Sequence, residues 1–170
     1  ALFKTDYLNT VVNHDIWGTQ YAAVLKNIYA VGAGIAHGLE YGDNFQSVYI
    51  TNAANEMIGF LRQVMAAKQA PDAGKINYAR SVYLGDLLVT CYSLYSRNRT
   101  FGNMIGKGYS VKVAQLEMNM VAEGYPASKG LYHINEQVQA DMPIASTIYR
   151  ILWERLPAAE GFALIEQVLE

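Results

Sequence analysis

The sequence contains few of the residues that metal sites, disulfides or nucleic-acid surfaces need. Its 170 residues include one cysteine, three histidines and four prolines. The lone Cys91 excludes an internal disulfide framework and a multi-cysteine zinc site. His14, His37 and His133 do not have metal-ligand spacing. Charged residues make up only 16% of the chain and the formal net charge is −2, which argues against a nucleic-acid or polybasic membrane partner.

Long apolar runs are also missing, although apolar residues are plentiful (52%) and there are 13 tyrosines. The charge-free stretches on either side of Lys26 are too short, and too rich in glycine and polar residues, to cross a bilayer. No signal-peptide pattern opens the chain. At roughly 150 residues per domain, we expect one soluble, cytoplasmic domain without a membrane span. The tyrosines suit core packing and a dimer surface, which leaves a homodimer open.

The spacing of apolar residues predicts an all-α protein after residue 14. Residues 16–36 are apolar nearly all round, as expected of a buried helix. Further helices are expected at 44–69, 75–80, 85–94, 97–106, 110–116, 126–139, 143–155 and 157–169. Residues 2–12 have a strand-like composition but no partner strands follow. We therefore interpret residues 1–13 as the end of a missing sheet and residues 14–170 as a helical domain.

Several residues predict how the helices begin and pack. Asp15, Ser96 and Ser110 can each cap a helix, as can Asp43 or Asn44. The segment 32–38 resembles a glycine-rich dinucleotide-binding loop, but its third glycine is one place late and it lies inside a helix. Its small residues instead predict close helix packing.

Two charges stand in apolar surroundings. Lys26 lies midway along the most apolar predicted helix, where it either reaches to water from one edge or lines a cleft as a proton-transfer residue. Asp86 lies in the apolar segment 84–89, where it is either a helix N-cap or the counter-charge of Lys26. The sequence alone leaves both pairs of alternatives open.

The segment 96–99 combines a capping serine with two arginines at a helix start. Backbone N–H groups, the helix dipole and the guanidinium groups of Arg97 and Arg99 would together bind an anion. The alternative is a solvated polar turn. Two arginines oppose the dipole preference at this end of a helix, which a bound anion would explain.

These segments together resemble NAD(P)-dependent glycerol-3-phosphate dehydrogenases over about residues 15–156. The matching motifs fall in family order: LKNIYAVGAGI at 25–35, GDN at 42–44, EM at 56–57, LGDL at 84–87, TC at 90–91, SRNR at 96–99, FG at 101–102, EG at 123–124, MPI at 142–144, and Tyr149. The resemblance implies the C-terminal, substrate-binding half of such an enzyme. Its fold would be a helical bundle of the 6-phosphogluconate-dehydrogenase C-terminal type, preceded by a strand remnant of the cofactor domain.

The family reaction interconverts dihydroxyacetone phosphate and sn-glycerol 3-phosphate, a phospholipid precursor, with NAD or NADP as hydride carrier. Carried over by position, Lys26 resembles the catalytic lysine, which also binds substrate. Asp86, Ser96, Arg97 and Asn98 match substrate-binding residues. The cofactor contacts in this half match Arg97, Val121 and Glu123. Since most cofactor contacts lie in the other half of the family's enzymes, we expect this chain to be inactive alone.

Two other functions remain open on the sequence. One is a related two-domain dehydrogenase for another hydroxy or keto acid, because two arginines also suit a carboxylate. The other is a non-catalytic helical module for dimerisation or anion sensing. Such a module would have no need of Lys26 and Asp86 inside its most apolar segments.

Overall fold

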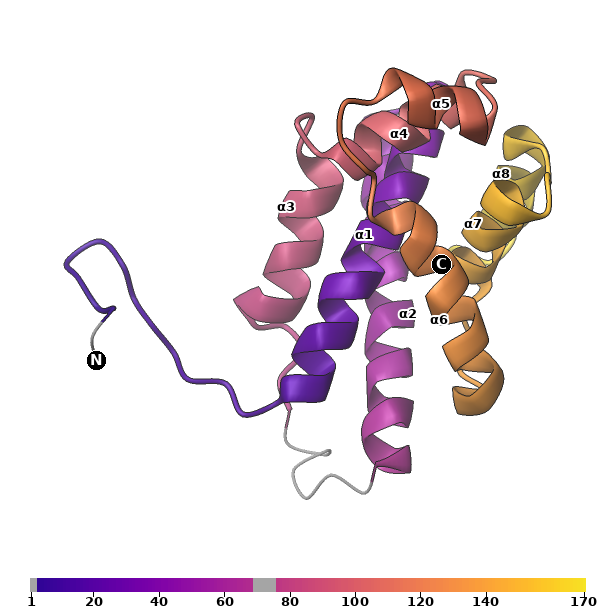
Figure 1. The fold of residues 1–170 in the computed structure, drawn as a ribbon. Helices are drawn as coiled ribbons and strands as arrows, with labels where there is room; N and C mark the ends of the chain where they lie inside the picture. Colours follow the sequence, from indigo (N-terminus) through magenta and orange to yellow (C-terminus); the bar gives the residue numbers. More distant parts are fainter. Residues whose placement is uncertain (1–2, 69–75) are drawn as a thin grey trace.

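The computed structural model describes residues 3–68 and 76–170, and within these ranges the regular structure is entirely helical (Figure 1). This confirms the all-α prediction. The elements are α1 (Ile16–Gly38), α2 (Asp43–Ala67), the π-helical turn η2 (Ser81–Gly85), α3 (Asp86–Tyr92), α4 (Arg97–Gly106), α5 (Val111–Glu117), α6 (Gly124–Val138), α7 (Pro143–Trp153) and α8 (Ala158–Glu166).

Helix α1 forms the centre of the bundle, as its apolar sequence predicts. It contacts α2, α3, α4, α6 and α7, and every residue from Ile28 to Ala36 is buried. Figure 1 shows α3 on one side of α1 and α6, α7 and α8 on the other. A side chain that leaves α1 near its middle can therefore meet groups from several segments that are distant in sequence.

Glycines allow α1 and α4 to pack with their backbones nearly touching. A Cβ atom added at Gly34 would lie 2.1 Å from the carbonyl oxygen of Arg99, and one added at Gly102 would lie 2.0 Å from that of Val31. Real Cβ contacts are never this short, so only glycine fits at both positions. The segment 32–38 is therefore a packing surface, as predicted.

Side-chain caps form at three of the predicted helix starts. The Asp15 carboxylate accepts from the N–H of Gly18 at 2.8 Å, and the Ser96 and Ser110 hydroxyls accept from residues three positions later. Helix α2 differs, because Gly42 is its N-cap and makes no side-chain bond. Asp43 is instead in its first turn, where a carboxylate favours the helix dipole.

Two predicted elements are not seen in the described residues. Residues 3–13 form no strand, and their described backbone pairing is a turn between Thr5 and Leu8. They extend away from the bundle (Figure 1), and a strand-like composition produces no strand without partner strands beside it. Residues 76–80 are not helical either; the rest of the helix expected at 75–80 lies outside the described residues.

One buried carboxylate joins three helices. Glu56 of α2 accepts hydrogen bonds from the backbone N–H groups of Ile144 (2.7 Å) and Ala145 (2.9 Å) at the start of α7. It also accepts from the hydroxyl of Tyr29 in α1 at 3.0 Å. The carboxylate thus satisfies donors that the first turn of α7 would otherwise leave unpaired.

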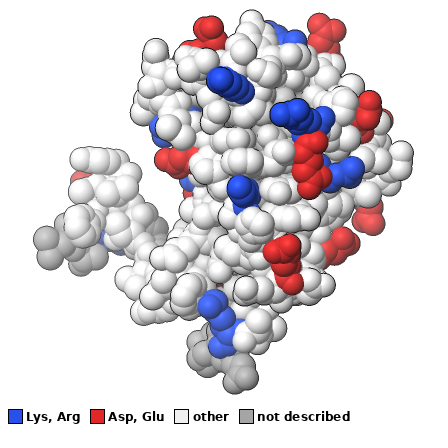
Figure 2. Space-filling view, turned by 45° about the vertical axis from the view of Figure 1, so that its right-hand side comes forward, with Lys and Arg blue, Asp and Glu red and all other residues white. Residues whose placement is uncertain are grey.

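The surface of the bundle has mixed charge. On the face drawn in Figure 2, basic and acidic side chains alternate without a large patch of one sign. None of the helices in the described ranges combines the length and apolarity that crossing a membrane requires. Across the same ranges, no three His, Cys, Asp or Glu side chains gather as a metal site would need.

Candidate functional site

The structure brings Lys26 and Asp86 into direct contact. Lys26 Nζ lies 2.6 Å from Asp86 Oδ2, and the two side chains are 23% and 36% exposed. Lys26 leaves α1 between the fully buried Leu25 and Ile28. Asp86 is the first residue of α3, where Gly85 is the N-cap. Asp86 is therefore the counter-charge of Lys26 rather than a cap, and the pair keeps one edge open to solvent.

A hollow of about 310 Å³ is lined by residues that neighbour this ion pair along α1 and α3. The predicted residues Ser96, Arg97 and Asn98 line it. Lys26 and Asp86 are not in its lining, but their neighbours are: Asn27 follows Lys26, and Thr90 lies one helical turn after Asp86. The Thr90 hydroxyl donates to the Asp86 carbonyl oxygen at 2.6 Å.

The remaining lining residues are Val89, Ser93 and Tyr95. Of the substrate-binding residues inferred from the resemblance, Ser96, Arg97 and Asn98 therefore line one hollow, whereas Lys26 and Asp86 pair with each other beside residues that line it.

Only one of the two arginines in segment 96–99 faces this hollow. Ser96 caps α4 by accepting from the N–H of Arg99 at 3.4 Å, which leaves Arg97 as the first helical residue. The Arg97 side chain is 45% exposed. The Arg99 guanidinium instead donates to the carbonyl oxygen of Tyr92, at the end of α3. The predicted two-arginine site thus contains a single available guanidinium.

Asn98 connects three helices beneath the hollow. It is 7% exposed. Its side-chain nitrogen donates to Asn27 Oδ1 at 2.9 Å, and its oxygen accepts from the N–H of Gly124, the first residue of α6, at 2.9 Å. An added Cβ at Gly124 would come within 2.4 Å of the Asn27 carbonyl oxygen. Asn98 therefore fixes the positions of α1, α4 and α6 relative to one another.

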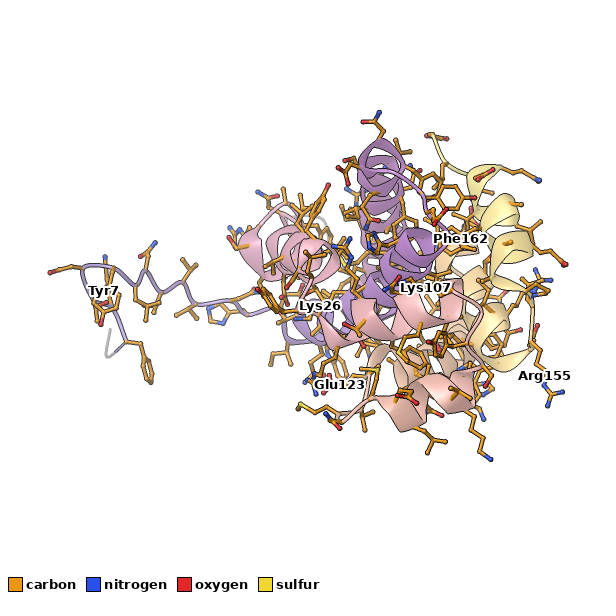
Figure 3. All side chains as sticks on the ribbon, turned by 90° about the horizontal axis from the view of Figure 1, so that it is seen from above. Tyr7, Lys26, Lys107, Glu123, Arg155 and Phe162 are labelled. Carbon is orange, nitrogen blue, oxygen red and sulfur yellow. The ribbon has the colours of Figure 1, made fainter. Side chains whose placement is uncertain are left out.

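The expected cofactor contacts are only partly brought together. Arg97 Nη2 lies 4.0 Å from Glu123 Oε1, and Glu123 is 65% exposed. Val121 lines a separate hollow of about 100 Å³ together with Met118, Asn119 and Met120. In Figure 3, Lys26 and Glu123 lie on the side of the body that faces the N-terminal segment.

Asn27 and Thr90 were not identified from the sequence as site residues. A positional signal was present, because Asn27 adjoins Lys26 and Thr90 is four residues after Asp86, on the same helical face. Both are polar residues within the apolar segments that made the two charges conspicuous. Tyr95, which is 96% exposed, carried no comparable signal.

A family model and the sequences of known proteins match this chain to the same enzyme family. A family model described as "NAD-dependent glycerol-3-phosphate dehydrogenase C-terminus" matches residues 15–163. A glycerol-3-phosphate dehydrogenase [NAD(P)+] from Staphylococcus saprophyticus is 37% identical over 160 residues, which are 94% of this chain and 46% of that protein. The relative from Staphylococcus carnosus is 37% identical over 164 residues, 96% of this chain and 47% of its own length.

Solved structures of glycerol-3-phosphate dehydrogenases share the fold of this chain. Glycerol-3-phosphate dehydrogenase from Coxiella burnetii has a TM-score of 0.78 and 28% identity, covering 92% of this chain and 45% of that one. A Saccharomyces cerevisiae glycerol-3-phosphate dehydrogenase shares the fold with a TM-score of 0.82 at 24% identity, covering 97% of this chain and 46% of that one. The chain spans about half the length of the relatives that it matches. It belongs to the NAD-dependent glycerol-3-phosphate dehydrogenase C-terminal domain family.

Proposed function

We propose that this chain supplies the catalytic lysine and the substrate-phosphate position of an oxidoreductase that interconverts dihydroxyacetone phosphate and sn-glycerol 3-phosphate. NAD or NADP is the hydride carrier in this proposal. The supporting observation is the 2.6 Å contact between Lys26 and Asp86, whose neighbours along α1 and α3 line the same hollow as Arg97. Family membership and the printed names of the relatives point to the same reaction.

The proposed role of Lys26 follows from the charge that the reaction creates. Reduction of a ketone places negative charge on its oxygen, and a lysine ammonium can stabilise that charge and deliver a proton. One N–H group of the Lys26 ammonium points to Asp86. Its other two N–H groups are therefore available to the substrate oxygen. In the reverse direction, Lys26 accepts the hydroxyl proton of glycerol 3-phosphate.

The proposed phosphate position combines several donors. Arg97 offers a planar fork that can bind two phosphate oxygens at once. The start of α4 adds backbone N–H groups and a favourable dipole. Asn98 has two amide hydrogens and uses one on Asn27, so its other N–H is available. Asn27 lines the same hollow and keeps a second amide hydrogen besides the one that it donates to the Ala23 carbonyl oxygen.

The residues present also suit part of a nicotinamide cofactor. Among the described residues, Glu123 is the only carboxylate within 4.0 Å of Arg97, so the guanidinium fork still has donors for a cofactor phosphate. Arg97, Glu123 and the exposed Val121 would hold the cofactor from this half. When bound, the nicotinamide supplies or accepts the hydride. This chain's own residues position the substrate and move the proton.

A second candidate is a two-domain dehydrogenase for another hydroxy or keto acid, because the Arg97 fork would also pair with a carboxylate. A substrate panel separates the two. We would fuse the chain behind the first half of the Staphylococcus carnosus relative and follow nicotinamide oxidation with dihydroxyacetone phosphate, dihydroxyacetone and several keto acids. A strong preference for the phosphorylated triose is expected. Preference for a keto acid would refute the assignment.

A further inference from the structure

A second, larger hollow lies away from the ion pair. A groove of about 960 Å³ runs between α4 and α5 on one side and α7 and α8 on the other. Small-molecule sites typically have volumes of about 300–1,000 Å³. In Figure 3, Arg155 lies at the edge of the molecule opposite to Lys26 and Glu123. The groove is therefore a separate feature from the proposed substrate site.

One wall of the groove is a fixed aromatic surface. Tyr125 of α6 and Trp153 of α7 stack with ring centroids 4.2 Å apart and planes inclined by 9°. The indole N–H donates to Ser128 Oγ at 3.1 Å, and this hydroxyl donates to the Tyr125 carbonyl oxygen at 2.7 Å. The indole bond orients the Trp153 ring and stacking holds the Tyr125 ring against it before any ligand arrives, which lowers the entropic cost of binding.

The charged residues of the groove are all of one sign. The described lining includes Lys112 and Arg155 and no acidic side chain. In the described parts of the chain, no carboxylate lies within 4.0 Å of either cation. An apolar groove with two cationic groups at its rim complements a molecule that has an apolar body and an anionic head.

We propose that the groove binds a small amphipathic anion, a carboxylate or phosphate monoester with an apolar chain. Its chain lies against Tyr125 and Trp153, and its head pairs with Arg155 and Lys112. The proposal does not depend on the reaction assigned above, because none of these four residues belongs to the proposed substrate site.

Fluorescence of Trp153 tests the proposal directly. The chain has two tryptophans, so a Trp17→Phe background leaves Trp153 as the reporter. Octyl phosphate, octanoate, octanol and inorganic phosphate are titrated separately, all below micelle formation. We expect saturable binding of an octyl anion at least tenfold tighter than that of octanol or phosphate. Whichever of octyl phosphate and octanoate binds with the higher affinity identifies the preferred anionic head group.

Variants of the two cationic groove residues test where the octyl anion binds. Lys112→Gln combined with Arg155→Gln should weaken the octyl anion at least tenfold and leave octanol unchanged, whereas Lys107→Gln, a nearby exposed cation outside the groove, should have no effect. If the double variant misfolds, Arg155→Gln alone is tested in its place. Equal binding of octanol and the octyl anions, or unchanged binding in the variants, would overturn the proposal. A dimer that forms with rising protein concentration, buries Trp153 and is not dissociated by octyl phosphate would also overturn the proposal. A second copy of the chain would then occupy the groove.

Discussion

Asn98 donates a hydrogen bond of 2.9 Å to the side chain of Asn27, the residue that follows Lys26 in α1. This bond links the helix that carries Arg97 to the helix that carries Lys26. Because the Asn27 amide in turn donates to the Ala23 carbonyl at 3.0 Å, its orientation is fixed as well. The spacing between the proposed proton donor and the proposed phosphate position is therefore set by contacts within and between helices rather than by surface loops.

Replacing Lys26 by alanine should abolish most turnover without unfolding the chain. In the proposed mechanism, loss of the proton donor lowers kcat by about 10²–10⁴-fold. The measurement is steady-state kinetics of the fused two-domain form with dihydroxyacetone phosphate, together with the Tm of the chain. Asp86→Asn should give a smaller loss because it displaces Lys26 without removing it. Near-normal turnover in Lys26→Ala would exclude Lys26 from the chemistry.

Arg97 and Arg99 form a matched pair for testing the phosphate position. Arg97→Ala should raise the KM for dihydroxyacetone phosphate and reduce its advantage over dihydroxyacetone, since the guanidinium lines the hollow. Arg99→Ala should instead lower the Tm, because its guanidinium binds the Tyr92 carbonyl. The ratio of kcat/KM for the two substrates is the readout. An Arg99 variant that lost the phosphate preference while Arg97→Ala kept it would reverse the assignment.

The local parts of this arrangement are predictable from sequence, and the long-range parts are not. A capping serine and its partner are three residues apart, so Ser96 could be identified from its neighbours. Lys26 and Asp86 were conspicuous because a charge in an apolar segment needs a partner. The bond from Asn98 to Gly124 and the turning of Arg99 toward Tyr92 depend on how distant helices approach, which no local pattern encodes.

The strand expected near the N-terminus is absent from the described residues for a related reason. Composition predicts what a segment prefers locally, whereas a strand exists only when another strand pairs with it. Residues 3–13 have suitable side chains but no partner among the described residues. The prediction that residues 1–13 complete a neighbouring domain's sheet stays a prediction, because it concerns contacts that this chain does not contain.

Glu56 should make stability depend on pH. Burial raises the pKa of its carboxyl from 4.5 to about 7, although bonds from Ala145, Ile144 and Tyr29 oppose the rise. The folded chain therefore holds this proton at pH values where the unfolded chain has lost it. The resulting stabilisation is complete below about pH 4.5 and disappears as the pH rises through about 7. We expect the free energy of unfolding to fall across this window.

Comparison with Glu56→Gln isolates the contribution of this carboxyl. The variant removes the titrating group and keeps a similar shape, so its unfolding free energy should change less between pH 5 and pH 7.5, as measured by urea denaturation. Identical pH profiles for the two proteins would show that Glu56 is ionised throughout.

Two glycines in helices should respond to alanine with opposite signs. At Gly34, in α1, the new Cβ would meet the Arg99 carbonyl oxygen at 2.1 Å, which forces α1 and α4 apart. Overpacking of this kind costs about 1–3 kcal/mol or more. At Gly59, in α2, nothing lies within 4 Å of the added Cβ, so Gly59→Ala should stabilise the chain by about 0.5–1 kcal/mol because alanine restricts the unfolded chain and favours the helix.

The Gly34 variant also tests whether packing of α1 against α4 positions the site. Since Arg97 and Asn98 lie in the first turn of α4, separating the two helices should lengthen the Asn98–Asn27 contact and raise the KM for the phosphorylated substrate. Gly59→Ala leaves this contact untouched and should keep the KM unchanged while raising the Tm. If Gly34→Ala lowered the Tm but left the KM as it was, the phosphate position would be set by the Ser96 cap rather than by the approach of the two helices.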